Sequence, residues 1–112
     1  GYDEEMSFAA VSGDRETGRI VGTSSYFRDA DTGLADVAYM VDPEWHGRGL
    51  GTVLHEITAD YARRHGVRGF TADVLMGNDA MMTIFRRSPG ELEVVEDVDR
   101  YEIQLTWPES SM

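Results

Sequence analysis

Residues 43–54 read PEWHGRGLGTVL, and the organisation of the whole chain can be worked out from this stretch. An apolar run precedes it, Gly47, Gly49 and Gly51 alternate within it, and apolar residues at helical spacing continue to His65. Backbone N–H groups at the start of a helix point outward at its positively polarised end. The stretch therefore predicts a phosphate-binding site. The simpler alternative is a tight turn whose glycines permit close packing.

The composition narrows the class of protein. A length of 112 residues favours one compact domain, and a net charge of −11 argues against binding to nucleic acid or anionic membranes. No run of about 18 apolar residues is present and the acidic start does not resemble a signal peptide, so we expect a cytoplasmic protein. The absence of cysteine excludes disulfides and a cysteine nucleophile.

Apolar runs on both sides of the glycine turn indicate further strands and a second helix. Residues 34–41 are apolar on both faces apart from Asp36, as expected for a central strand covered on two sides. A strand, a helix and a strand over residues 34–76 imply a parallel pair with a right-handed crossover. The predicted strands are 6–12, 19–28, 34–41, 68–76, 92–96 and 101–107, the helices are 49–65 and 80–87, and residues 108–112 are expected to fray. The fold class is therefore α/β (α+β), with a mixed, twisted and largely antiparallel sheet.

The segment from Val41 to Leu54 resembles the acyl-CoA-binding segment of the Gcn5-related N-acetyltransferase (GNAT) superfamily, whose pattern is Gln/Arg-x-x-Gly-x-Gly/Ala. Gly49 and Gly51 match its glycines, while His46 stands at the Gln/Arg position. The order of the predicted elements is similar to that family from its second strand to its last. Residues 69–75, with Asn78, Met81 and residues 85–87, more narrowly resemble the acetyltransferase domain of bacterial protein lysine acetyltransferases.

This resemblance implies transfer of an acetyl group from acetyl-CoA to an amine, either a protein lysine or a small molecule. A catalytically weak, CoA-binding regulatory module is the alternative. The initial strand and helices that wall the acceptor site in this family have no counterpart before residue 1. A fragment, a missing segment supplied by another chain, or a reduced domain would each explain this, and an uncovered edge strand would favour a homodimer.

The resemblance also suggests site residues. Asp36 is the candidate general base, although this position commonly holds a longer glutamate, and a solvated or arginine-paired carboxylate is the alternative. Asn78 would contact the cofactor or merely cap a helix, and Phe85 stands where many relatives carry an acidic tyrosine. The predicted cofactor-binding residues are Met40, Val41, His46, Gly47, Arg48, Gly49, Leu50, Gly51, Thr52, Asn78 and Phe85.

The remaining candidates are histidines and tyrosines. His46, His55 and His65 show no metal-ligand spacing, and we expect each on the surface, with His46 in reach of a CoA phosphate. Tyr39 and Tyr61 are expected in the core. The sequence therefore predicts no metal site.

Overall fold

The computed structural model describes residues 2–14 and 16–108; Gly1, Arg15 and residues 109–112, the larger part of the tail predicted to fray, lie outside this description. Within it, six strands and two α-helices follow the predicted order. They are β1 (Tyr2–Ser12), β2 (Arg19–Asp29), β3 (Leu34–Val41), the short 3-10 helix η1 (Pro43–Trp45), α1 (Leu50–Arg64), β4 (Gly69–Leu75), α2 (Asp79–Arg87), β5 (Glu91–Glu96) and β6 (Arg100–Thr106). Only β1 departs from its predicted bounds by more than one residue.

Strand β1 begins at Tyr2, four residues before its predicted start at Met6. The extension was not predicted because its first residues are acidic. Glu4 nevertheless lies on the inward side of the strand, where its carboxylate accepts a hydrogen bond from the hydroxyl of buried Tyr26. In the described part of the chain β1 pairs with β2 alone, so its outer edge is open. The homodimer expected from such an edge stays a prediction.

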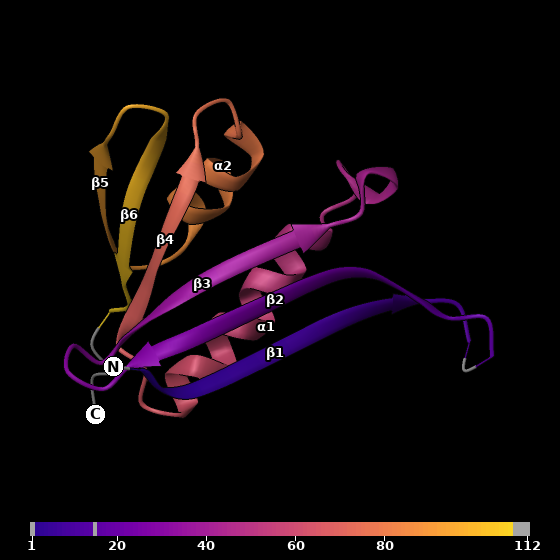
Figure 1. Cartoon of the computed structure of the whole chain (residues 1–112), viewed down its shortest axis with the longest axis horizontal. Helices are drawn as coiled ribbons and strands as arrows, with labels where there is room; N and C mark the ends of the chain where they lie inside the picture. The colour runs from indigo at the N-terminus through magenta and orange to yellow at the C-terminus, as the bar shows by residue number, and fades with distance from the viewer. Residues whose placement is uncertain (1, 15, 109–112) are drawn as a thin grey trace.

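The sheet has the order β1-β2-β3-β4-β6-β5 and is antiparallel except between β3 and β4. These two strands are parallel and are connected through α1, which confirms the predicted mixed sheet with a central parallel pair. Figure 1 shows that β3 and β4 meet at one end and then diverge. The sheet is therefore divided into β1–β3 and β4–β6.

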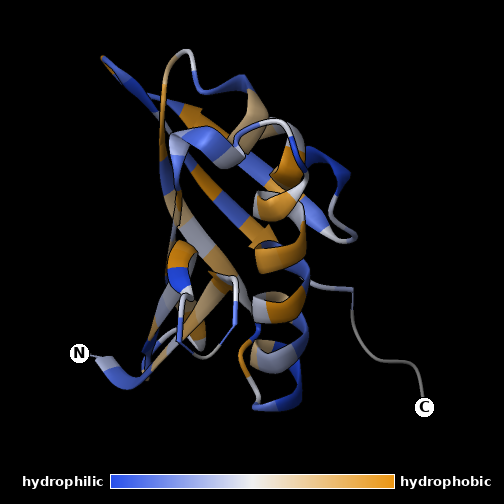
Figure 2. Cartoon of the chain, turned by 90° about the vertical axis from the view of Figure 1, so that its right-hand side faces the viewer, coloured by the Kyte–Doolittle hydropathy of each residue, from blue (hydrophilic) through white to orange (hydrophobic). Residues whose placement is uncertain are grey.

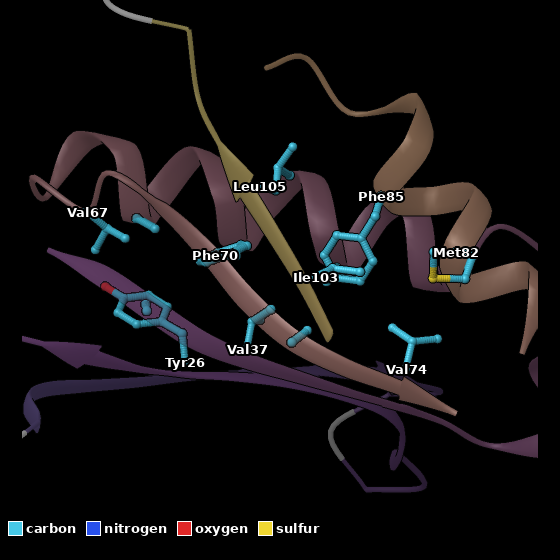
Figure 3. Close-up of a cluster of buried hydrophobic side chains, with 12 residues drawn as sticks. Tyr26, Val37, Val67, Phe70, Val74, Met82, Phe85, Ile103 and Leu105 are labelled. Carbon is cyan, nitrogen blue, oxygen red and sulfur yellow. The ribbon is translucent and has the colours of Figure 1, made fainter. Parts of the chain in front are cut away.

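The core lies between one face of this sheet and both helices (Figure 2). The buried cluster in Figure 3 takes Phe70 from β4 and Phe85 from α2. Ala62 of α1 belongs to the same cluster. The opposite face is open, so the expectation that β3 is covered on two sides is wrong. Asp36, Ala38 and Met40 point to that open face and are exposed, because no described helix packs on it.

The buried stripe of helix α1 agrees only in part with the one that apolar spacing predicts. The buried residues are Leu54, His55, Thr58 and Ala62. Val53 and Ile57, which the apolar spacing of residues 49–65 places on the inward side with Leu54, are about half exposed. Polar residues replace them because each has a partner: the Thr58 hydroxyl lies 2.6 Å from that of buried Ser24, and His55 is hydrogen-bonded at both ring nitrogens. The expectation that His55 lies on the surface is therefore wrong.

Candidate functional site: an open strand edge beside a glycine turn

The divergence of β3 and β4 leaves one edge of β3 beyond Asp36 without a strand partner in the described part of the chain. The parallel pairing covers only Leu34 to Asp36 on β3. Asp42, just after β3, donates its backbone N–H to the Val21 carbonyl of β2 at 2.8 Å. In an antiparallel pair every second residue directs its backbone N–H and C=O groups toward the partner strand, and the residues between direct theirs away from it. Val37, Tyr39 and Val41 therefore direct their backbone polar groups toward the gap, whereas those of Met40 face β2.

The glycine turn lies directly after this open edge. Gly47 and Gly49 have φ angles of 77° and 82°, which L side chains rarely adopt, and a Cβ built on either meets nothing within 4 Å. Gly51 has a different role, since a Cβ there would lie 3.1 Å from Ile84 on α2. Both readings of the alternating glycines thus apply, Gly51 permitting close helix packing and the first two leaving space above the turn.

The N-terminus of α1 differs from that of α2. Gly49 is the N-cap of α1, no side chain caps it, and the first turn holds no acidic residue. At α2, Asn78 Oδ1 accepts the Met81 N–H at 3.2 Å, and Asp79 supplies a negative charge. Among the described residues, α1 alone leaves the N–H groups of its first turn uncapped, and this arrangement favours an anion.

Two side chains of the turn are engaged within it. The guanidinium of Arg48 lies over the Trp45 ring at 4.9 Å from its centroid, and His46 Nε2 lies 3.0 Å from the Val41 carbonyl oxygen. Both residues are exposed. Arg48 therefore lies against Trp45 and is not among the residues that line the cavity beside the turn, whereas His46 connects the turn to the end of β3.

A cavity of about 820 Å³ joins the turn to the gap. Its wall includes Tyr39 and Met40, neighbours on β3 whose side chains lie on opposite faces, so the cavity reaches the strand edge itself. Nine of the predicted cofactor-binding residues line it: Met40, Val41, His46, Gly47, Gly49, Leu50, Gly51, Thr52 and Asn78. Its size and its mixed apolar and polar wall are typical of ligand sites.

Phe85 is not part of this wall. Its side chain is 1% exposed and packs in the core against the rings of His55 and Tyr39, at centroid distances of 5.3 and 6.2 Å. The expectation that Phe85 contacts a cofactor is therefore corrected. Its hydrophobic ring is buried because α2 turns this side toward α1 and β3.

Asp36 stands on the open face of the sheet, beside the point where β3 and β4 separate. Thr71, its register partner on β4, donates its hydroxyl to Asp36 Oδ1 at 3.2 Å. Desolvation raises the pKa of Asp36; the Thr71 hydrogen bond opposes this rise, and the charge of Asp73 adds to it. The arginine pairing considered as an alternative does not occur among the described contacts of Asp36, whose raised pKa suits a proton acceptor.

Sequence reasoning missed a buried hydrogen-bonded histidine in the cavity wall. His55 is 4% exposed, with Nδ1 at 2.6 Å from the Tyr39 hydroxyl and Nε2 at 2.6 Å from Ser88 Oγ. Burial lowers the pKa of His55 from 6.5 to about 4 and raises the pKa of the Tyr39 hydroxyl. The histidine is thus neutral near pH 7.

This buried histidine predicts an acid-sensitive stability. Its pKa is lower in the folded state, so its contribution is intact above pH 6.5 and is lost as the pH falls toward 4, to a total of ~3 kcal/mol. We expect the free energy of unfolding of the wild type to fall more over this range than that of His55→Asn, measured by urea titration. Equal slopes, or an NMR titration of His55 near 6.5, would contradict the assignment.

No helix in the described ranges is long and apolar enough to cross a membrane. The sequence model of the Acetyltransferase (GNAT) family matches residues 1–88. The fold is similar to the GNAT domain of Streptomyces lividans PAT, with 26% identity and a TM-score of 0.76 over 91% of this chain and 60% of that one. It is also similar to a cAMP-binding acyltransferase from Mycobacterium smegmatis, with 25% identity and a TM-score of 0.79 over 97% of this chain and 33% of that one.

At lower identity, 18%, a GCN5-related N-acetyltransferase from Kribbella flavida shares the fold, with a TM-score of 0.75 over 91% of this chain and 67% of that one. The chain thus spans less than two thirds of the first two proteins. The family match covers most of the sequence, and it includes the divergent strands and the uncapped glycine turn. This chain belongs to the GNAT family of acetyltransferases.

Proposed function

We propose that this domain transfers an acetyl group from acetyl-CoA to an amine, with the lysine side chain of a protein as the acceptor. The observation that carries the proposal is the uncapped N-terminus of α1, which opens on the same cavity as the unpaired edge of β3. Two parts of one ligand would be bound there. The pyrophosphate oxygens of CoA would accept hydrogen bonds from the uncapped backbone N–H groups of Leu50, Gly51 and Thr52, and Arg48 would add a positive charge.

The pantetheine arm would lie in the gap as an additional strand. Its amides can pair with the backbone of Val41 and Tyr39, which faces the gap, while the side chain of Met40 flanks the opening. Asn78 uses its Oδ1 to cap α2, so its side-chain N–H₂ remains to contact the arm. His46 would act through Val41, whose carbonyl it already contacts.

The reaction is attack by an amine on the thioester carbonyl. The C–N bond forms, the C–S bond breaks, and the CoA thiolate leaves. A lysine amine has a pKa of about 10.4 and must first lose a proton, which Asp36 would accept directly or through one water. Phe85 has no acidic hydrogen and no protein acid is assigned, so the thiolate would take its proton from solvent. The second proton of the attacking nitrogen would be released to solvent as the amide forms.

Residues 69–87 support protein lysine as the acceptor, because this segment carries the narrower resemblance to bacterial protein lysine acetyltransferases. The open face around Asp36 is also acidic, with Asp73 nearby, which suits a cationic chain. A small amine is the second candidate. A weakly catalytic CoA-binding module is the third, because the shorter aspartate stands where glutamate is common.

Calorimetry and a thiol-release assay test these candidates together. We expect acetyl-CoA to bind and CoA thiol to appear when a lysine peptide is added, with weaker turnover of a polyamine at equal amine concentration. Dephospho-CoA serves as the control for the 3′-phosphate, and an N-acetyllysine peptide as the control for the acceptor. Binding without turnover of either amine would select the regulatory module, and absence of binding would reject the assignment.

A further inference from the structure

Three side chains from separate elements form a continuous hydrogen-bonded chain along the cavity wall. We propose that Tyr39, His55 and Ser88 are positioning residues that fix the width of the gap between β3 and β4 for the pantetheine arm of acetyl-CoA. This inference rests on the proposed function, because it concerns how that ligand is received. It assigns a role to the buried histidine that acyl transfer itself does not use.

The contact of Ser88 with Ile84 assigns one set of donors and acceptors to this chain. Ser88 donates its hydroxyl hydrogen to the Ile84 carbonyl at 3.0 Å, so its oxygen must accept from His55 Nε2–H at 2.6 Å. The other ring nitrogen, Nδ1, then carries a lone pair and accepts from the Tyr39 hydroxyl at 2.6 Å. One neutral tautomer satisfies all three side chains, which holds them in one arrangement.

The chain connects the two halves of the divided sheet. Tyr39 belongs to β3, on the β1–β3 side of the gap, and its own backbone faces that gap. Ser88 is the C-cap of α2, the helix that directly follows β4 on the other side. His55 on α1 lies between them, so β3 is tied to the β4 half although the direct pairing of the strands ends at Asp36.

Aromatic packing supports the same link. The His55 ring meets Phe85 on α2 at 5.3 Å and Phe70 on β4 at 6.1 Å, both edge to face. The ring therefore contacts residues of β4 and α2, while its Nδ1 is hydrogen-bonded to Tyr39. Loss of one hydrogen bond leaves a buried group of His55 unsatisfied, and relief of that cost requires a shift across the gap.

The test compares two ligands on three variants. Tyr39→Phe and Ser88→Ala each remove one hydroxyl of the chain, and the third variant combines them. Tyr61→Phe removes a tyrosine hydroxyl outside the chain, and Ser24→Ala removes a buried serine hydroxyl that contacts Thr58. The ligands are acetyl-CoA and 3′-phosphoadenosine 5′-diphosphate, which has the phosphates but no pantetheine arm. Calorimetry gives each affinity, and urea unfolding gives the stability of each ligand-free variant.

We expect Tyr39→Phe and Ser88→Ala each to bind acetyl-CoA about tenfold more weakly than wild type, and to bind 3′-phosphoadenosine 5′-diphosphate within about twofold of wild type. The double variant should lose less than the product of the single losses, since either change breaks one chain. Both controls should keep both affinities, whatever their stability. Equal loss for the two ligands, or no loss for acetyl-CoA, would overturn the inference. Wild-type protein that does not bind acetyl-CoA would instead reject the proposed function.

Discussion

Replacement of Gly49 by glutamate is expected to weaken acetyl-CoA binding about 100-fold, or ~2.7 kcal/mol. Gly49 has a φ of 82° and caps α1 without a side chain, and a Cβ there points into open space. The new carboxylate would therefore enter the proposed phosphate-binding site, where it would neutralise the positive end of helix α1 and repel the pyrophosphate. Calorimetry with acetyl-CoA measures the loss, and Gly49→Ala separates backbone strain from charge, with an expected loss of about fivefold.

Gly66 offers a matched control for the same substitution. It has a φ of 84°, nothing lies within 4 Å of a Cβ built on it, and it follows the other end of α1. Gly66→Glu should therefore cost similar backbone strain and add the same charge, yet leave acetyl-CoA affinity within about twofold of wild type. Equal affinities of Gly49→Glu and Gly66→Glu would show that the phosphate lies elsewhere.

The glycine turn could be predicted because its information is local. Three alternating glycines between a strand and an amphipathic helix indicate a tight turn and an uncapped helix start within about ten residues, and two of them, Gly47 and Gly49, adopt positive φ angles. The boundaries of most elements follow from the same short-range signals, such as Pro43 at the end of β3. The two roles of the glycines could not be separated, because the packing of Gly51 against Ile84 depends on the angle between two helices.

The buried stripe of α1 was outside the reach of such signals. Hydrophobic periodicity places Val53 and Ile57 inside, whereas the structure buries His55 and Thr58. The histidine is stable there only because Tyr39 and Ser88, 16 and 33 residues away in sequence, approach its two nitrogens. Partners at such separations are set by the tertiary arrangement, and a polar residue without visible partners is assigned to the surface by default.

The open face of β3 was missed for a related reason. Apolar residues on both sides of a strand are typical of a strand that is covered on both faces, yet the Met40 side chain is 72% exposed. The residue types on a strand show that a face is apolar enough to pack, but they do not show whether another element covers that face. This error places Asp36 in a more accessible position than expected.

Replacement of Asp36 by asparagine is expected to lower kcat about 100-fold while leaving the affinity for acetyl-CoA within about twofold of wild type. The amide keeps the size of the side chain and its contact with the Thr71 hydroxyl but cannot accept the proton of the amine. Thiol release at saturating acetyl-CoA and lysine peptide measures the rate. Full turnover of Asp36→Asn at every pH would exclude this carboxylate as the base.

Two neighbours of Asp36 test the same assignment through opposite pH shifts. Activity requires the ionised carboxylate, so the acid limb of kcat/KM should rise with pH through the pKa of Asp36, which lies above 3.8. Asp73→Asn removes a charge that raises this pKa, so the limb should move to lower pH. Thr71→Val removes the hydrogen bond that lowers it, so the limb should move to higher pH. Asp73→Asn also removes an acidic charge that suits a cationic acceptor, so the assignment is judged from the midpoint of each limb and not from the height of its plateau. Only a titrating Asp36 predicts limbs displaced in these opposite directions, and unchanged midpoints would contradict it.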